Sequence, residues 1–424
     1  MGYTENLIDF IGKSTDCYHA VKTAKDRLDE NGFTELFEGD KWDVQSGGKY
    51  YVIRNSSSII AFEMPKKDFG AFMICASHTD SPSFKLKPDF EINADGCIKL
   101  SVEGYGGMIM SSWLDRPLSI SGRIVIAKDG KIETKLVNID RDLLVIPSLA
   151  IHMSRDINKG YEFNIRRDMC PIASEKNGRI EDIIAESVGV DKEEILGFDL
   201  SLYNRMHGAV LGADGEYFSA PRIDDLQCMY STLEGFLNSE SDDNVTVFAA
   251  FDNEEVGSGT KQGAKSSFLR DVLERICDNS ETYKRAVAKS FMLSCDNAHA
   301  VHPNFADKSD GTNRVYMNGG IVIKYNANQR YTTDAVSEAV VKYVCKNAGV
   351  PYQMYANRSD IPGGSTLGNL SNEKVSLNTA DIGLAQLAMH SSYETAGSRD
   401  TEYMVKMIKE FYKTEIVLLM LYSA

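Results

Sequence analysis

The sequence predicts an α/β fold in which helices flank a mixed, mostly parallel sheet and a β-rich domain is inserted into the chain. Apolar runs at residues 71–76 and 245–251 do not alternate with polar residues, which is typical of strands buried on both faces of a sheet. Helical and strand patterns alternate after residue 222, whereas alternating strand patterns and turns precede it. We therefore expect a domain formed by residues 1–92 and 222–424, with a β-rich insertion at residues 93–221.

The first domain is expected to begin with helix and to continue with strands. Apolar residues recur three to four positions apart across residues 1–37, where Asn31-Gly32 supplies a stop signal. Residues 50–53 and 58–63 then have the composition of strands, and the run at 71–76 follows them.

The insertion is expected to contain a β-hairpin. Residues 119–126 alternate between polar and apolar side chains, and residues 131–137 follow after an Asp129-Gly130 pair. An Asp-Gly pair between two strand patterns indicates a tight hairpin turn.

Helices and strands alternate in the last part of the chain, as expected when helices cover a sheet. The predicted helices are 226–237, 269–277, 333–348 and a final, inward-packed 401–421, and the predicted strands are 245–251 and 291–294.

Composition excludes several classes of protein. The 424 residues carry 46 Lys and Arg against 61 Asp and Glu, a formal charge of -15, so we expect binding to neither nucleic acid nor an anionic membrane. No stretch approaches the ~20 apolar residues of a membrane-spanning helix, and the acidic N-terminus lacks a signal-peptide core. The eight cysteines are scattered singly, which favours reduced thiols in the cytoplasm over a disulfide framework.

Potential metal ligands follow three of the predicted strands. His78 and Asp80 come after the first strand, Glu254 and Glu255 after the second, and Asp296 after the third. Because the carboxyl ends of parallel strands lie at one edge of a sheet, we expect these side chains to converge.

Asp224, at the start of a predicted helix, and His390, after an apolar stretch, are two further candidates. Imidazoles and carboxylates suit Zn²⁺, Mn²⁺ or Co²⁺, which indicates a hydrolytic site with two divalent cations. Two cations ~3.5–4 Å apart share a carboxylate and lower the pKa of a bridging water. If one of Glu254 and Glu255 binds metal, the other is free to act as general base on that water.

Each candidate also has an ordinary structural interpretation. A single histidine or a Glu-Glu pair is more often a hydrogen-bonded or solvated group, and Asp296 alone could cap a helix. The candidates gain weight from their shared position at strand ends.

Six ordered segments, which extend over nearly the whole chain, resemble the aspartyl aminopeptidase family. Members of that family are cocatalytic zinc exopeptidases that remove an N-terminal acidic residue from peptides. The resemblance implies a zinc-exopeptidase-like fold with an inserted dimerisation domain. The segments are Ser77–Pro82, Ile146–His152, Arg222–Asp225, Asp252–Ser258, Asp296–Asn304 and Leu387–Ser391.

The resemblance also implies a role for each candidate. Glu254 would be the general base, and Asp80 would orient His78. The implied ligands are His78, Asp224 and Asp296 for one ion and Asp224, Glu255 and His390 for the other, with Asp224 as the bridge.

His152, in the insertion, would reach into the site of a neighbouring subunit and stabilise the tetrahedral oxyanion. The family assembles from dimers into a twelve-subunit shell, so the resemblance implies a homo-oligomer, a dodecamer built from dimers.

A few positions depart from the family pattern. Asp225 stands where Asn is frequent, Asn253 where His is frequent, and Ser392-Tyr393 where Ile-Arg is common. None removes an implied ligand, but these residues bear on the choice of metal and of substrate side chain.

Lys324 and Arg330 are the candidates to pair with the acidic side chain of a peptide substrate that has a free N-terminus. Their segment is similar to the pocket strand of the family, whereas Lys324 taken alone would be an ordinary edge-strand lysine. Two other functions stay open: a related hydrolase for neutral or hydrophobic N-terminal residues or for acylated amides, and a non-catalytic shell or cargo-binding protein. An unliganded glutamate beside the ligands argues against the second.

Overall fold

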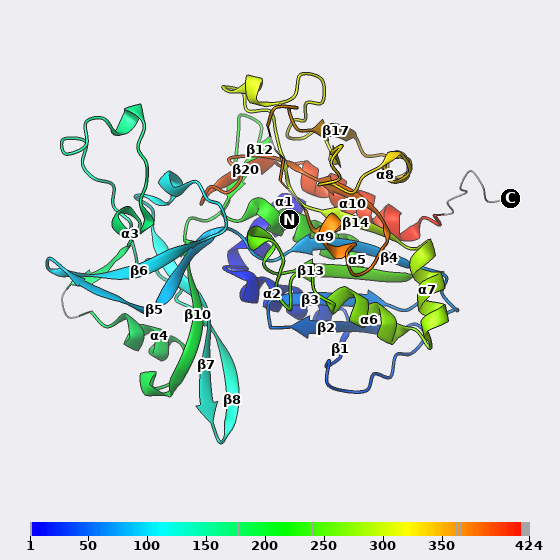
Figure 1. The fold of residues 1–424 in the computed structure, drawn as a ribbon, viewed down its shortest axis with the longest axis horizontal. Helices are drawn as coiled ribbons and strands as arrows, with labels where there is room; N and C mark the ends of the chain where they lie inside the picture. The colour runs from blue at the N-terminus through cyan, green and yellow to red at the C-terminus, as the bar shows by residue number, and fades with distance from the viewer. Residues whose placement is uncertain are drawn as a thin grey trace.

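A nine-stranded mixed sheet forms the centre of the computed structural model, which describes residues 2–175, 178–239, 241, 243–361, 363–364 and 366–416 (Figure 1). Strands β13, β4, β14 and β18 are neighbours and run parallel, and the strands outside them include antiparallel pairs. In sheet order the strands are β1 (Thr34–Glu35), β2 (Lys49–Arg54), β3 (Ser58–Glu63), β13 (Val245–Phe251), β4 (Phe72–His78), β14 (Phe291–Cys295), β18 (Asn378–Gly383), β16 (Ile321–Tyr325) and β17 (Tyr352–Ala356).

Helices cover both faces of this sheet, which explains the unalternating strands. Met73 and Cys75 of β4 belong to the apolar core on one face, and Ile74 and Ala76 belong to the core on the other. One face is covered by α1 (Tyr3–Lys13), α2 (Cys17–Glu30), α5 (Ile223–Leu237), α8 (Ala335–Ala348) and α10 (Asp400–Lys413), and the other by α6 (Phe268–Ile276), α7 (Ser280–Lys289) and α9 (Leu367–Ser371).

A six-stranded antiparallel sheet with its own apolar core lies beside the central body, on the left of Figure 1. Its hairpin turns at Asp129 and Gly130, both with positive φ, as the Asp-Gly signal predicts. Helices α3 (Ile165–Asp168) and α4 (Ile180–Val188) accompany it. In sheet order the strands are β8 (Lys131–Asn138), β7 (Leu118–Lys128), β10 (Ile195–Asn204), β5 (Ser83–Ala94), β6 (Cys97–Tyr105) and β9 (Ile172–Glu175).

A third, five-stranded sheet joins parts of the chain that are far apart in sequence. Strand β12 pairs with β20, so residues 217–220 lie beside residues 394–397. The strands of the six-stranded sheet lie between residues 83 and 204. The limits 93 and 221 of the inserted domain stay a prediction. The strands in order are β11 (Ala209–Leu211), β12 (Tyr217–Ala220), β20 (Glu394–Gly397), β19 (Ala385–Leu387) and β15 (Ala298–His299).

Two predicted helices differ from the structure. The predicted N-terminal helix is divided, because Ser14 ends α1 and the Asp16 carboxylate accepts hydrogen bonds from the first amides of α2. The last helix ends at Lys413, where Thr414 becomes extended, so the prediction that it reaches residue 421 is wrong at residues 414–416. Residues 417–421 of that prediction lie outside the described residues. Among the described helices, none is long and apolar enough to cross a membrane.

Candidate metal centre

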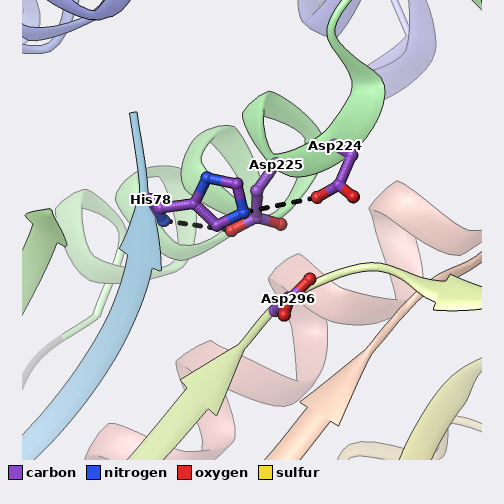
Figure 2. Close-up of side chains that lie close together, drawn as sticks. All are labelled: His78, Asp224, Asp225 and Asp296. Atoms are coloured by element: carbon purple, nitrogen blue, oxygen red, sulfur yellow. Dashed lines mark hydrogen bonds and ion pairs between the residues drawn. The ribbon is translucent and has the colours of Figure 1, made fainter. Parts of the chain in front are cut away.

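The carboxyl ends of β4, β13 and β14 meet at one edge of the central sheet. The register of β4 and β13 sets His78 beside Phe251, so residues 252–255 continue next to His78. Asp296 follows β14 on the other side of β4. Figure 2 shows His78, Asp224, Asp225 and Asp296 close together, with Asp224 and Asp225 at the first turn of α5.

One group of potential ligands surrounds His78. Its ligand atoms, from His78, Asp224, Asp225 and Asp296, all lie within 4.8 Å of one another. The His78 Nε2 atom is 3.3 Å from Asp224 Oδ1, and the His78 backbone N–H donates to Asp225 Oδ2 at 3.1 Å. All four residues are buried, so no bulk water compensates their charges.

A second group shares Asp224 with the first. The His390 Nε2 atom lies 3.6 Å from Asp224 Oδ2 and 3.4 Å from Glu255 Oε1, and the three ligand atoms lie within 4.8 Å of one another. Each of the two oxygens of Asp224 therefore faces a different histidine. That is the arrangement expected of a carboxylate that bridges two metal ions.

The donor set fits divalent cations. Among the described residues, Asp224 Oδ1, Asp225 Oδ1 and Glu255 Oε1 are buried and accept no hydrogen bond. Burial and the charge of Asp224 raise the pKa of Glu255 well above its usual value. Burial, together with the charges of Asp296 and Asp224, does the same for Asp225. A cation in this space would supply the partner that these oxygens lack.

The carboxylates around His78 shift the pKa of this histidine upward as well. Burial alone would lower the pKa of His78, but the surrounding carboxylates outweigh it and hold that pKa well above 6.5. Burial would likewise raise the pKa of Asp224, yet His390 and His78 hold it below its usual value. Because a metal ligand must be a neutral imidazole, binding of a cation here would release a proton.

Glu254 lies beside the ligands on the turn that follows β13. Burial, reinforced by the charges of Asp296 and Asp80, raises the pKa of Glu254 to about 8. Asn253 precedes it with a positive φ of 65°, which Asn tolerates better than most residues. A carboxylate with a pKa near neutrality is suited to accept and to return a proton.

Asp80 connects His78 to this turn. Its Oδ1 accepts a hydrogen bond from the Glu254 backbone N–H at 3.1 Å, and its Oδ2 accepts one from the Glu255 N–H at 3.2 Å. His78 Nδ1 lies 3.0 Å from the Asp80 backbone carbonyl and 3.5 Å from its carboxylate. Asp80 therefore faces both the histidine and the two glutamates.

Glu394 is a further member of the site, which the sequence patterns do not indicate. This buried residue accepts hydrogen bonds from the backbone N–H of Asp224 at 3.0 Å and of His390 at 2.7 Å. It thus fixes the backbone of two candidate ligands from different parts of the chain. Its position four residues after His390, next to the sixth segment, was the available signal.

Lys324 is buried beside Asp296, with 3% of its surface exposed. Its Nζ donates to the Asn297 carbonyl at 2.8 Å and lies 3.5 Å from Asp296 Oδ2. Arg330 is exposed and donates to the Gly363 carbonyl at 3.0 Å. The structure therefore brings Lys324, but not Arg330, against a candidate ligand.

A cavity of about 360 Å³ adjoins the residues just before His390. This volume is in the range that holds a small ligand. Neither Lys324 nor Arg330 is among its lining residues. The lining includes His299, Asn313, Tyr355, Arg358, Gln386 and Met389.

His152 lies apart from the metal centre within its own chain. It is exposed, in the segment between β8 and α3. The apolar side chains of Leu149, Ile151 and Met153 beside it are also exposed. In a single subunit, His152 is not brought together with the other candidate residues.

Comparison with known proteins agrees with this geometry. Residues 10–412 match the family model described as "Aminopeptidase I zinc metalloprotease (M18)". The chain is 45% identical over 428 residues to "Probable M18 family aminopeptidase 2" of Clostridium acetobutylicum, covering 97% of this chain and 98% of that protein. It is 38% identical over 418 residues to a protein of the same name from Pseudomonas aeruginosa, covering 96% and 97%.

Solved structures are similar over the same length. The structure described as "Cryo-EM structure of the Ape4 and Nbr1 complex" contains a chain with a TM-score of 0.94 and 35% identity, covering 97% of this chain and 85% of that one. The structure described as "Structure of S. cerevesiae mApe1 dodecamer" has a TM-score of 0.84 and 29% identity, covering 96% of each chain. The zinc-exopeptidase-like fold expected from the sequence is confirmed.

Proposed function

The chain belongs to the M18 family of aminopeptidase I zinc metalloproteases, and on that premise we propose that it removes N-terminal residues, Asp or Glu by preference, from peptides at a two-metal centre. The observation that carries the proposal is Asp224, whose Oδ1 faces His78 of the first group of ligands and whose Oδ2 faces His390 of the second. Zn²⁺ suits both groups, and Mn²⁺ or Co²⁺ is compatible with them.

The reaction divides between the cations and the protein. The two groups of ligands would hold divalent cations, which would supply a Lewis acid for the peptide carbonyl and lower the pKa of a bound water. Glu254 takes a proton from the attacking water and delivers it to the leaving amine, a role that its carboxylate beside the ligands can fill. Asp80 holds the Glu254 and Glu255 amides in place, and Glu394 holds those of Asp224 and His390.

Replacement of Glu254 by Gln tests this mechanism. The amide keeps the shape of the side chain but cannot carry the proton, so we expect kcat to fall by about 10²–10⁴ while the bound metal is retained. The measurement is hydrolysis of aminoacyl substrates together with the metal content of the purified protein. Normal hydrolysis by Glu254→Gln would remove the proposed mechanism.

Preference for an acidic residue is tested with substrates carrying N-terminal Asp, Glu, Leu or an acetylated amide. Lys324 is our candidate to compensate the substrate carboxylate, because it is a buried cation next to the site. We expect Lys324→Ala to lower kcat/KM for Asp and Glu far more than for Leu, with Arg330→Ala as the exposed comparison. Equal losses on all substrates would leave Lys324 as a partner of Asp296 alone. A wild-type preference for Leu would indicate the neutral aminopeptidase instead.

We further propose that the protein is a homo-oligomer, a dodecamer built from dimers, in which His152 completes the site of a neighbour. The dodecamer of the S. cerevesiae relative and the exposed apolar residues beside His152 support this assembly. The eight free cysteines fit the reducing cytoplasm, which is the proposed location. Chelation that dissolved the assembly in a protein that cleaves no peptide would favour the non-catalytic shell.

A further inference from the structure

One end of the six-stranded sheet reaches the metal centre of its own subunit. Strand β6 ends at Tyr105, and the Tyr105 hydroxyl donates a hydrogen bond to Asp80 Oδ2 at 2.6 Å. The same hydroxyl accepts a hydrogen bond from Asn253 Nδ2 at 2.8 Å. A side chain from the insertion thus contacts the two residues that flank Glu254 in space.

The chain after Tyr105 continues along the site. Gly106 has a φ of 70°, and a Cβ atom at this position would lie 3.0 Å from the Cβ of Glu255. The Ile109 N–H donates to the His390 carbonyl at 3.0 Å. We name residues 105–109 the strap. The strap contacts both the turn that carries Glu254 and Glu255 and the loop that carries His390.

We propose that Tyr105 is a positioning residue, through which the inserted sheet holds Asp80 and thereby fixes the turn that carries Glu254 and Glu255. This inference rests on the proposed function only where activity is measured, because the hydrogen bonds exist without any substrate.

The hydrogen bonds around Asp80 form one connected group. Its carboxylate accepts from the Tyr105 hydroxyl and from the backbone N–H groups of Glu254 and Glu255. Burial and the charge of Asp80 raise the pKa of Tyr105, so its hydroxyl remains a donor at physiological pH. Loss of that donor leaves a buried carboxylate with one partner fewer, and hydrogen bonds to charged groups are the strong ones.

Asn253 carries the connection to the far side of the turn. Its Oδ1 accepts hydrogen bonds from the Thr260 hydroxyl and from Gln262 Nε2, both at 2.8 Å. The Tyr105 hydroxyl therefore links the Asp80 carboxylate to the Asn253 side chain, in addition to the bonds that Asp80 accepts directly from the Glu254 and Glu255 amides.

The experiment uses Tyr105→Phe, which removes the hydroxyl and keeps the ring. Tyr203→Phe is the matched control, because Tyr203 lies in the same sheet, is buried, and donates to Asn138 Oδ1 at 2.9 Å without contacting Asp80. In the full-length protein without added metal, we expect hydrogen exchange at the Glu254 and Glu255 amides to become about tenfold faster in Tyr105→Phe only. Unchanged exchange at these amides would overturn the inference, whether or not the protein is a peptidase.

Kinetics of the metal-loaded oligomer provide the second measurement. We expect kcat of Tyr105→Phe to fall roughly tenfold to a hundredfold with KM and metal content near wild type, while Tyr203→Phe keeps its kcat. Combining Tyr105→Phe with Asp80→Asn should cost little beyond Asp80→Asn alone, because the tyrosine acts through that carboxylate. Additive losses of kcat in the double variant, or a kcat of Tyr105→Phe within twofold of wild type, would contradict the positioning role of Tyr105.

A further variant tests the same placement if Tyr105→Phe does not assemble. The Lys85 Nζ atom lies over the Tyr105 ring at 4.2 Å from its centroid, so Lys85→Met loosens the ring and leaves the hydroxyl. A severalfold faster exchange at the two amides is expected, and no change would overturn the inference. A wild-type protein that hydrolyses no aminoacyl substrate would refute the proposed function. The exchange measurements would then still test whether Tyr105 positions the turn of Glu254 and Glu255.

Discussion

Asp400, the first residue of α10, is a buried carboxylate away from the metal centre. Its oxygens accept hydrogen bonds from the backbone N–H of Asn318 at 2.6 Å and of Gly320 at 2.9 Å. These contacts fasten the loop before β16 to the start of α10. Burial nevertheless raises the pKa of Asp400 to about 7, because two amides compensate only part of the lost hydration.

We expect Asp400 to make the folded protein less stable as pH rises from about 4 to about 7. The folded state keeps a proton on Asp400 over this interval, whereas the unfolded chain has lost it, so the free energy of unfolding falls with pH. The rise in the pKa of Asp400 from 3.8 to about 7 corresponds to a loss of at most about 4 kcal/mol in the free energy of unfolding. In Asp400→Asn this part of the pH dependence should disappear from thermal unfolding curves, whereas the exposed Asp9→Asn should retain it. An unaltered pH dependence in Asp400→Asn would contradict the raised pKa.

Residues that could be predicted are those whose side chains carry the chemistry. His78, Asp224, Glu255, Asp296 and His390 are ligand types at strand or helix ends, and the structure brings them together. Glu394 and Tyr105 escaped prediction because they act by hydrogen bonds to backbone or to a carboxylate from distant parts of the chain. Sequence patterns hold no local trace of such contacts.

At the scale of elements, the position of α5 depends on close packing against α10. Gly235 of α5 faces Ile408 of α10, and an added Cβ would lie 2.4 Å from Ile408 Cγ2. Ile408 is fully buried, so it has little room to move. Asp224 and Asp225 lie in the first turn of the same helix, so the helix that packs closely against α10 also carries two candidate ligands.

Gly235→Ala should therefore destabilise the protein. We expect the free energy of unfolding to fall by about 1–3 kcal/mol, as overpacked cores do. Gly12→Ala is the control, since Gly12 lies in α1 with no atom near the added Cβ and should gain roughly 0.5–1 kcal/mol. Denaturant titration of both variants measures these free energies of unfolding. An unchanged value for Gly235→Ala would show that α5 and α10 can move apart enough to accommodate the added methyl group.

Helices and strands were predictable where one hydrophobic pattern or one turn signal determined the local structure. The runs that became β4 and β13 have no polar face, and the Asp129-Gly130 hairpin follows from backbone preference alone. Helix ends are decided differently. Capping and the packing of the helix against its neighbours determine where α1 gives way to α2 and where α10 ends at Lys413. Helical periodicity continues past such points, so it gives the helix but not its limits.

At the scale of the whole molecule, the third sheet was beyond sequence reasoning. It pairs residues 217–220 with 394–397, and both partners are short strands. No local pattern tells such strands which distant segment they will join. The pairing nonetheless brings Glu394 beside Asp224, and the metal centre depends on it.

Active sites completed by a neighbour can be tested by mixing inactive subunits. Glu254→Gln and His152→Ala should each be nearly inactive as pure assemblies. If His152 acts across subunits, the His152→Ala subunit of a mixed dimer keeps its own Glu254 and would receive His152 from its partner. We expect about a quarter of the wild-type activity after co-assembly in equal amounts. A mixture no more active than its parents would mean that His152 does not act across subunits.

The wide spacing of the ligands along the chain has a consequence for biosynthesis. His78 leaves the ribosome early, Asp224 and Glu255 much later, and His390 close to the end of the described chain. Since chains are made from the N-terminus onward, the first group is complete once Asp296 has emerged, whereas the second also needs His390. Until His390 has been made, a growing chain therefore lacks one of the residues that the proposed two-metal site requires.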